Sequence, residues 1–166
     1  MLIKKIETAL NKQINLEFYS SYLYLSMSAY FNGLNLEGFA HWMKLQAQEE
    51  LMHAIKLYDF VLERDGNVTF EAIKAPPATW KSPVAACEAV LKHERLNTKQ
   101  INMLMDLVLT AKDHASATFL QWFIDEQVEE EASASTLVEK TKLVADSGGG
   151  TYMLDRELAS RQLGPE

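Results

Sequence analysis

The sequence predicts an all-α protein: a four-helix bundle with one long crossover connection and a short fifth helix at its C-terminal end. Long proline-free stretches with apolar residues at helical spacing fill most of the 166 residues. Two of the three connections between the four long stretches are short, and the middle one is long enough to travel the length of a bundle. A hydrophobic content of 48% against 23% charged residues is that of an ordinary globular domain. We therefore expect one domain over residues 1–166.

Turn residues and prolines set the expected boundaries of the helices. The helices are expected at about residues 3–31, 36–64, 84–111, 114–145 and 151–162. The connection before residue 84 contains Pro76, Pro77 and Pro83, which exclude a regular helix there. The bundle itself thus covers about 3–145, and the Ser-Gly-Gly-Gly run at 147–150 is expected to be a linker to the last helix.

Charge and cysteine content exclude several classes of protein. A net charge of -7 argues against a nucleic-acid or anionic-membrane binder and suits a protein that attracts cations. The sequence has no signal-peptide pattern and no run of about 18 apolar residues, so we expect a soluble, cytoplasmic protein. Cys87 is the only cysteine, which leaves neither an intrachain disulfide nor a cysteine-rich zinc site.

Each long helix carries one glutamate in the row of residues expected to face the bundle core. These rows follow heptad spacing and are otherwise mostly apolar or aromatic. The four glutamates are Glu17, Glu50, Glu94 and Glu130. His53 and Gln127 lie three residues from two of them, on neighbouring inward rows. At about 1.5 Å of rise per residue, all four lie on the order of 15 to 24 Å from the start of their helix. An antiparallel bundle would therefore bring them to one level.

The charge of these four carboxylates needs compensation. None of the inward rows contains lysine or arginine, and a carboxylate buried without a partner costs several kcal/mol. Any one inward glutamate, or a lone core histidine, is more often a structural residue than a ligand. Four such carboxylates at one level favour a metal site instead. Oxygen ligands with one imidazole and no thiolate favour iron or manganese.

Four runs of the sequence resemble bacterial and archaeal non-haem ferritins. They are NLEFYSSYLYLSMSAYF from residue 15, QAQEELMH from residue 46, KHE from residue 92 and FLQWFIDEQVEEE from residue 119. The resemblance covers essentially the whole chain. It implies a ferritin-like fold and a two-iron ferroxidase centre in each subunit, where dioxygen or hydrogen peroxide oxidises iron(II). It also implies a hollow shell of 24 identical subunits that stores the ferric mineral.

The resemblance also assigns roles to individual residues. It implies that a first iron is bound by Glu17, Glu50 and His53. It implies that a second iron is bound by Glu50, as the bridge, together with Glu94 and Glu130. Gln127 and Tyr24 take positions beside these ligands, where Gln127 can hydrogen-bond a ligand, peroxide or water. A third, weaker iron position on the cavity side is implied at Glu49, Glu126, Glu129 and Glu130, although such an acidic run can also be a solvated helix face.

Residues that differ from those of related families indicate which branch the sequence resembles. Gln127 stands where the general di-iron bundle has the glutamate of a second Glu-x-x-His pair, which fits non-haem ferritins. Leu51 stands where bacterioferritins have their haem-binding methionine, and Met52 comes one place too late, so no haem is expected. Ala117 and Leu120 occupy the positions where animal ferritins have the acidic residues of the three-fold channel. This puts an acidic route for iron entry along the three-fold axis in doubt.

Two other classes of protein fit the sequence less well. A DNA-protecting mini-ferritin fits poorly, because the chain is acidic, lacks a basic tail and carries its ligands inside the bundle. A structural bundle without metal would leave the four core glutamates unexplained.

The segment Val68–Ile73 is expected to be extended and to pair with its copy across a two-fold axis. Met153, Leu154 and Leu158 of the last helix must be buried, either against neighbouring subunits around a four-fold axis or against their own bundle.

Overall fold

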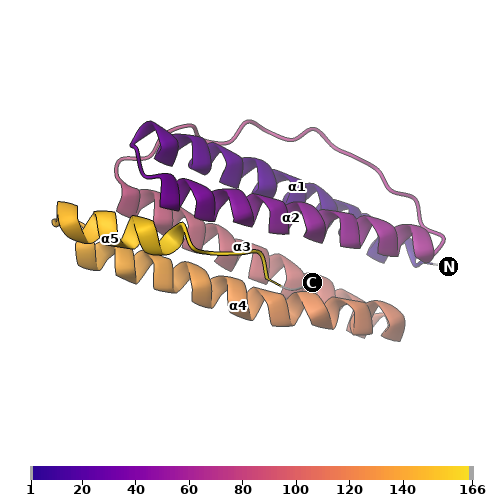
Figure 1. The fold of residues 1–166 in the computed structure, drawn as a ribbon. Coiled ribbons are helices and arrows are strands. Elements are labelled where there is room, and N and C mark those ends of the chain that lie inside the picture. The colour runs from indigo at the N-terminus through magenta and orange to yellow at the C-terminus, as the bar shows by residue number, and fades with distance from the viewer. Residues whose placement is uncertain (1, 165–166) are drawn as a thin grey trace.

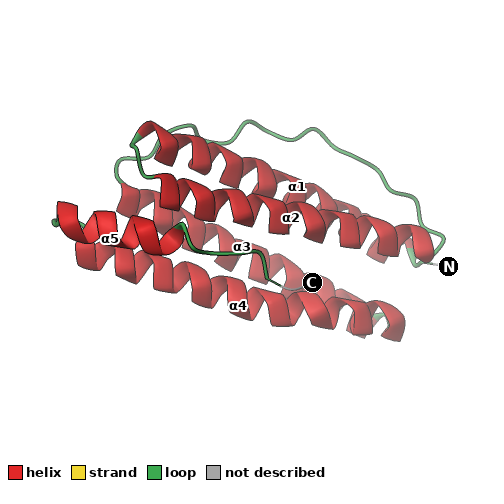
Figure 2. Ribbon diagram, in the orientation of Figure 1, coloured by secondary structure: helices red, strands yellow, loops and turns green. Residues whose placement is uncertain are grey.

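A computed structural model describes residues 2–164 as two antiparallel helix pairs that pack into a four-helix bundle, with a fifth helix on its side (Figure 1). The helices are α1 (Lys4–Gly33), α2 (Glu37–Glu63), α3 (Pro83–Thr110), α4 (His114–Val144) and α5 (Gly148–Leu158). Residues 64–82 form the crossover, which leads from the end of α2 to the start of α3 along the outside of the bundle (Figure 1). Helices are the only regular elements in the described residues (Figure 2). The predicted fold class is therefore confirmed.

The ends of the long helices follow the local signals in the sequence. Asn35, Asp65 and Lys112, one in each turn after α1, α2 and α3, have φ angles of 57°, 55° and 56°. Asparagine and aspartate tolerate this left-handed conformation better than most residues. At the start of α3, the Ser82 side chain accepts a hydrogen bond from the Ala85 amide at 3.1 Å. No helix of the described residues is long and apolar enough to span a membrane.

The crossover is held to the bundle by a buried asparagine. Asn11 of α1 donates to the carbonyl oxygen of Asn67 at 2.9 Å and accepts from the Thr69 amide at 2.9 Å. The following segment forms no strand within the described chain, and Phe70 and Ile73 remain 65% and 41% exposed. Both side chains are therefore free to contact a second subunit.

The core consists of two apolar clusters separated by a polar layer. One cluster occupies the end of the bundle that includes Phe31 and Phe39, and the other occupies the end that includes Leu10 and Leu57. In every long helix the inward glutamate lies between the residues of the two clusters. The four carboxylates therefore share one level, as the rise per residue predicts.

Helix α5 begins earlier than expected. Residues 148–150, predicted as part of a flexible linker, form its first turn, and the helix ends at Leu158 rather than near residue 162. The Ser147 side chain caps the helix by accepting a hydrogen bond from the Gly150 amide at 3.0 Å. This cap satisfies an amide that the helix leaves free and offsets the low helix propensity of glycine.

Helix α5 packs onto its own bundle. Leu154 and Leu158 are buried against the apolar cluster that includes Phe31 and Phe39. Asp155 accepts a hydrogen bond from the Phe39 amide at 3.0 Å. Met153 was expected on the buried side but is 73% exposed, because the side of α5 that touches the bundle carries the two leucines. The exposed side of α5 remains available to a neighbouring subunit.

Close contact between α5 and α2 requires a glycine, so we expect Gly38→Ala to displace α5. A Cβ at Gly38 would lie 1.7 Å from the carbonyl oxygen of Asp155, a backbone atom that moves only with its helix. Overpacking of this kind typically costs about 1 to 3 kcal/mol, which a thermal unfolding curve would record as a lower midpoint. Gly33→Ala is the matched control, since a Cβ there meets nothing within 4 Å. Equal midpoints for the two variants would contradict the docking of α5.

Candidate metal centre

The polar layer of the bundle gathers the side chains that the sequence singled out. The residues brought together and buried there are Glu17, Tyr24, Glu50, His53, Glu94, Gln127 and Glu130. They come from all four long helices, and each apolar cluster closes one end of the layer. The site is therefore a buried layer of polar side chains in the middle of the bundle, called here the polar chamber.

Glu17, Glu50 and His53 present their donor atoms to one point. One ligand atom from each lies within 4.8 Å of the other two. His53 Nδ1 is 3.5 Å from Glu50 Oε2. Neither carboxylate oxygen of Glu50 has a hydrogen-bond partner, although the residue is completely buried. Buried polar atoms are almost always paired, so the geometry of Glu50 fits a carboxylate whose partner is a cation.

A hydrogen-bond network orients Glu17. Gln13 donates to Glu17 Oε1 at 2.6 Å, and Asn97 donates to Glu17 Oε2 at 3.3 Å. Gln13 also lies 2.7 Å from Asn97 Oδ1, which links the two amides across α1 and α3. Partners of this kind orient a ligand and are as much part of a metal site as the ligand itself. The sequence reasoning missed both amides, although Gln13 lies one turn before Glu17 and Asn97 three residues after Glu94.

Two further donors hold Glu94. The Tyr24 hydroxyl donates to Glu94 Oε1. Gln127 Nε2 lies 3.4 Å from Glu94 Oε2 and 3.2 Å from the hydroxyl of Thr98. Burial, followed by the charges of Glu94 and Glu50, raises the pKa of Tyr24 well above its usual value. The phenol therefore stays protonated and remains a donor.

Glu130 is held by Gln46, a residue for which the sequence predicted no role. Gln46 Nε2 donates to Glu130 Oε2 at 2.7 Å, and Gln46 Oε1 has no partner although it is buried. Gln46 lies one heptad before His53 on an inward row, which is the signal that would have identified it.

Crowding of carboxylates in this chamber favours their neutral forms. Burial, followed by the charges of Glu94 and Glu17, raises the pKa of Glu50 well above its usual value. Burial likewise raises the pKa of Glu94 to about 7. The pKa of Glu130 is also raised, first by burial and then by Glu94 and Glu49. A cation in the chamber would reverse this balance and favour the ionised carboxylates.

The implied third iron position is assembled only in part. His53, Glu126 and Glu130 have donor atoms within 4.8 Å of one another, and Glu126 is half-buried. Glu129 is exposed and lies outside that cluster. Glu49 is paired with Arg161, whose Nη2 lies 2.8 Å from Glu49 Oε2. The structure thus brings two of these four glutamates together with His53, and it gives Glu49 a different partner.

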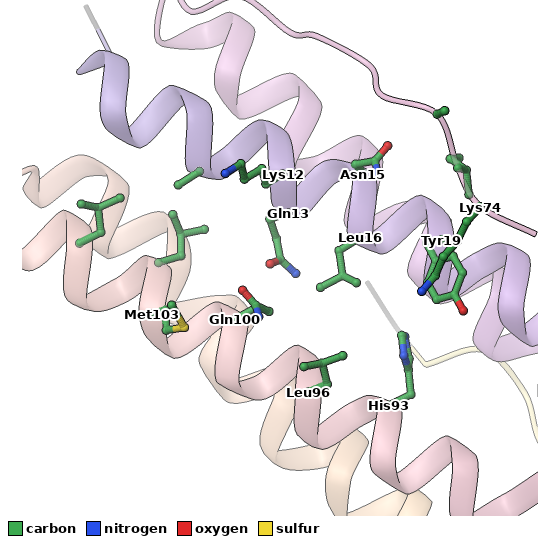
Figure 3. Close-up of a pocket in the computed structure, with 15 residues that line it drawn as sticks. Lys12, Gln13, Asn15, Leu16, Tyr19, Lys74, His93, Leu96, Gln100 and Met103 are labelled. Atoms are coloured by element: carbon green, nitrogen blue, oxygen red, sulfur yellow. The ribbon is translucent and has the colours of Figure 1, made fainter. Parts of the chain in front are cut away.

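A surface groove lies on the opposite side of Gln13 from Glu17. It has a volume of about 710 Å³ and is lined by residues of α1, α3 and the crossover. In Figure 3, Leu16 of α1 and Leu96 of α3 point toward one another across it, with Gln13 and His93 beside them. His93 Nε2 lies 2.7 Å from the hydroxyl of Ser20. A single layer of side chains thus separates the groove from the polar chamber, a feature the sequence did not reveal.

Comparisons with known proteins agree with this fold. The sequence matches the ferritin-like domain family over residues 7–144. It is 42% identical to a bacterial non-heme ferritin of Bacteroides fragilis over 97% of this chain and all of that one. It is 40% identical to a bacterial non-heme ferritin of Campylobacter jejuni, over 94% of this chain and 93% of that one.

Solved structures of an archaeal ferritin share the fold. The open pore ferritin of Archaeoglobus fulgidus superposes with a TM-score of 0.96 at 50% identity, covering 98% of this chain and all of that one. A closed form of the same ferritin, engineered by mutagenesis, gives a TM-score of 0.97 at 49% identity, covering 99% of this chain and all of that one.

A buried carboxylate and histidine cluster in a four-helix bundle with one crossover defines the ferritin-like class of metal-binding bundles. Identity of 40% or more over nearly the full length of non-heme ferritins narrows the class further. The chain belongs to the ferritin family, in the non-haem branch of bacterial and archaeal proteins. Iron binding and iron storage are thus the general role of this protein.

Proposed function

We propose that the buried centre is a ferroxidase site, which oxidises iron(II) before the ferric product is stored. The observation that carries the proposal is Glu50, a fully buried carboxylate with no hydrogen-bond partner on either oxygen. Its ligand atoms cluster with those of Glu17 and His53, and the charges of Glu94 and Glu130 also act on it. A bridging carboxylate between two cations needs both of its oxygens free.

Two groups of side chains would bind the two iron(II) ions that are oxidised together. Glu17, Glu50 and His53 would bind the first iron(II), and Glu50, Glu94 and Glu130 the second. Gln13 and Asn97 keep Glu17 oriented, while Tyr24 and Gln127 orient Glu94. Binding by carboxylates stabilises iron(III) more than iron(II), because the higher charge interacts more strongly with anionic oxygen ligands. The ligand set therefore favours loss of an electron from each ion.

The electrons balance with either oxidant. Two iron(II) ions lose one electron each, and dioxygen accepts both and becomes peroxide. With hydrogen peroxide as oxidant, two electrons and two protons convert it to two water molecules. Gln127, close to Glu94 in the chamber, is placed to hydrogen-bond the oxidant or water. We propose that the product then leaves past Glu130 and Glu126 toward Glu129 and the interior of a shell.

An iron titration of the purified protein tests this function. Iron(II) added in air to the metal-free protein should give a rapid rise in absorbance near 300 to 350 nm that ends after about two ions per subunit. Slower growth of the ferric mineral should follow with further iron. Oxidation no faster than in buffer alone would reject the ferroxidase role.

Loading with iron(II) should release protons. The pKa values of Glu50 and Glu130 are raised by burial and by the neighbouring carboxylates, so the metal-free centre holds protons near neutral pH. Cation binding favours ionised carboxylates and expels these protons. An anaerobic titration in weak buffer near pH 7 should therefore become more acidic as iron(II) is added. Glu50→Ala should release fewer protons, and an unchanged pH for the parent protein would refute the charge argument.

The proposal extends to the assembly and its location. The exposed Phe70 and Ile73 of the crossover and the exposed side of α5 suit contacts between copies of this chain. We propose a closed homo-oligomeric shell of 24 subunits, without nucleic-acid or membrane partners, in the cytoplasm. The ions inside each subunit are then substrate on its way to the stored mineral.

A further inference from the structure

The segment after α5 places a guanidinium next to the metal centre. Arg161 Nη2 lies 2.8 Å from Glu49 Oε2, and both side chains are mostly buried. Residues 161 and 49 are 112 positions apart in the chain, so the pair exists only because α5 docks onto α2. Ion pairs in partly buried places are screened less by solvent than surface pairs. Solvent and salt therefore weaken the attraction within this pair less than that within an exposed pair.

Three further contacts hold Arg161 in this position. Its guanidinium carbon lies 4.6 Å from the centre of the Trp42 ring, a cation–π arrangement. Arg161 Nη1 lies 3.4 Å from the Trp42 carbonyl oxygen. The backbone carbonyl of Arg161 accepts a hydrogen bond from His41 Nε2 at 2.9 Å. The guanidinium is therefore built into the α2 surface rather than free in solvent.

Glu49 lies one helical turn before His53 on α2, next to the outer cluster of His53, Glu126 and Glu130. Its charge raises the pKa of both Glu126 and Glu130, after the larger effect of burial. The positive charge of Arg161 acts in the opposite direction on Glu130. A metal ion beside Glu130 would therefore be repelled by Arg161 and attracted by Glu49.

We propose that Arg161 is a competing cation for Glu49, so that an iron ion moving outward from the two-iron centre must displace the guanidinium to gain this carboxylate. The inference rests on the proposed function. Arg161 is a positioning residue: it holds Glu49 away from the metal and contacts no substrate. While the pair is intact, the outer position has only His53, Glu126 and Glu130 within reach of one another. It binds iron weakly in that state and gains Glu49 when the pair opens.

Anaerobic calorimetry with iron(II) alone tests the competition. Arg161→Gln should leave the binding of iron(II) at the two inner positions unchanged. It should increase the affinity of the outer position for iron(II). A hydrogen bond to a charged group is worth about 1.5 to 3 kcal/mol, which corresponds to roughly 10- to 100-fold in affinity. Arg161→Lys keeps the charge and should stay close to the parent protein. Arg156→Gln, which removes an exposed arginine from α5 itself, is the matched control.

A double variant separates competition from loss of structure. If Arg161 acts through Glu49, Arg161→Gln combined with Glu49→Gln should lose the gain in affinity seen with Arg161→Gln alone. The inference would be overturned if Arg161→Gln bound iron(II) at the outer position with the affinity of the parent protein. It would also be overturned if the gain in affinity persisted in the variant that lacks Glu49. Absence of the two inner equivalents in the parent protein would instead defeat the proposed function. The gain at the outer position would still be measurable in that case.

Discussion

Replacing Glu50 by alanine is expected to slow iron(II) oxidation by more than about 100-fold, because loss of a partner that merely orients a ligand already costs about 10- to 100-fold. Glu50 lies between both proposed iron positions, and the change removes a ligand from each. Stopped-flow absorbance near 300 to 350 nm in air measures the effect. Glu63→Ala removes an exposed glutamate from the end of the same helix and is the matched control. A variant that oxidises iron at the parental rate would rule out the proposed centre.

The same substitution should keep or increase the thermal stability of the metal-free protein. Burial raises the pKa of Glu94 from 4.5 to about 7, so folding without metal is accompanied by proton uptake. For a carboxyl group with a raised pKa, stability is fully present below about pH 4.5 and is lost as the pH rises through about 7. Glu50→Ala removes a buried carboxyl group whose own pKa is raised by burial and by the charges of Glu94 and Glu17, so the gain should be largest above pH 7. A sharp loss of stability there would show that Glu50 has a structural partner after all.

The purified protein is expected to scatter light as a particle of about 24 times its 18.8 kDa subunit mass. The physical reason is the apolar surface that one chain leaves uncovered. Phe70 and Ile73 lie exposed on the crossover, and Tyr152 and Met153 lie exposed on α5. Surface of this kind is normally covered by another copy in a closed assembly. A monomer or simple dimer at micromolar concentration would defeat the shell while leaving the metal centre in place.

Phe70→Glu provides a variant for the same measurement. A charge at this exposed position should reduce the particle mass if the crossover forms a contact between subunits, because burying it without a partner is unfavourable. Glu71→Gln, at the neighbouring exposed position, should leave the mass unchanged. Intact particles of Phe70→Glu would show that the crossover lies outside the contacts.

The sequence by itself determined the helices and the glutamates of the core. Heptad spacing is a local property, so the inward rows with Glu17 and Glu50 could be read from each helix alone. The rise per residue then placed the carboxylates at one level, where the polar layer of the bundle lies. The identity of the ligand atoms follows from residue type, and this pointed to iron or manganese before any tertiary contact was known.

Only the tertiary structure decided how these ligands are held. Gln13 and Asn97 are 84 positions apart, and so are Gln46 and Glu130, so their hydrogen bonds depend on which helices become neighbours. Periodicity reports which face of a helix is buried but carries no information about the partner across the core. The early start of α5 depended on the cap at Ser147. The pairing of Glu49 with Arg161 arises because docking of α5 brings the end of the chain to α2, a choice made by packing rather than by local sequence.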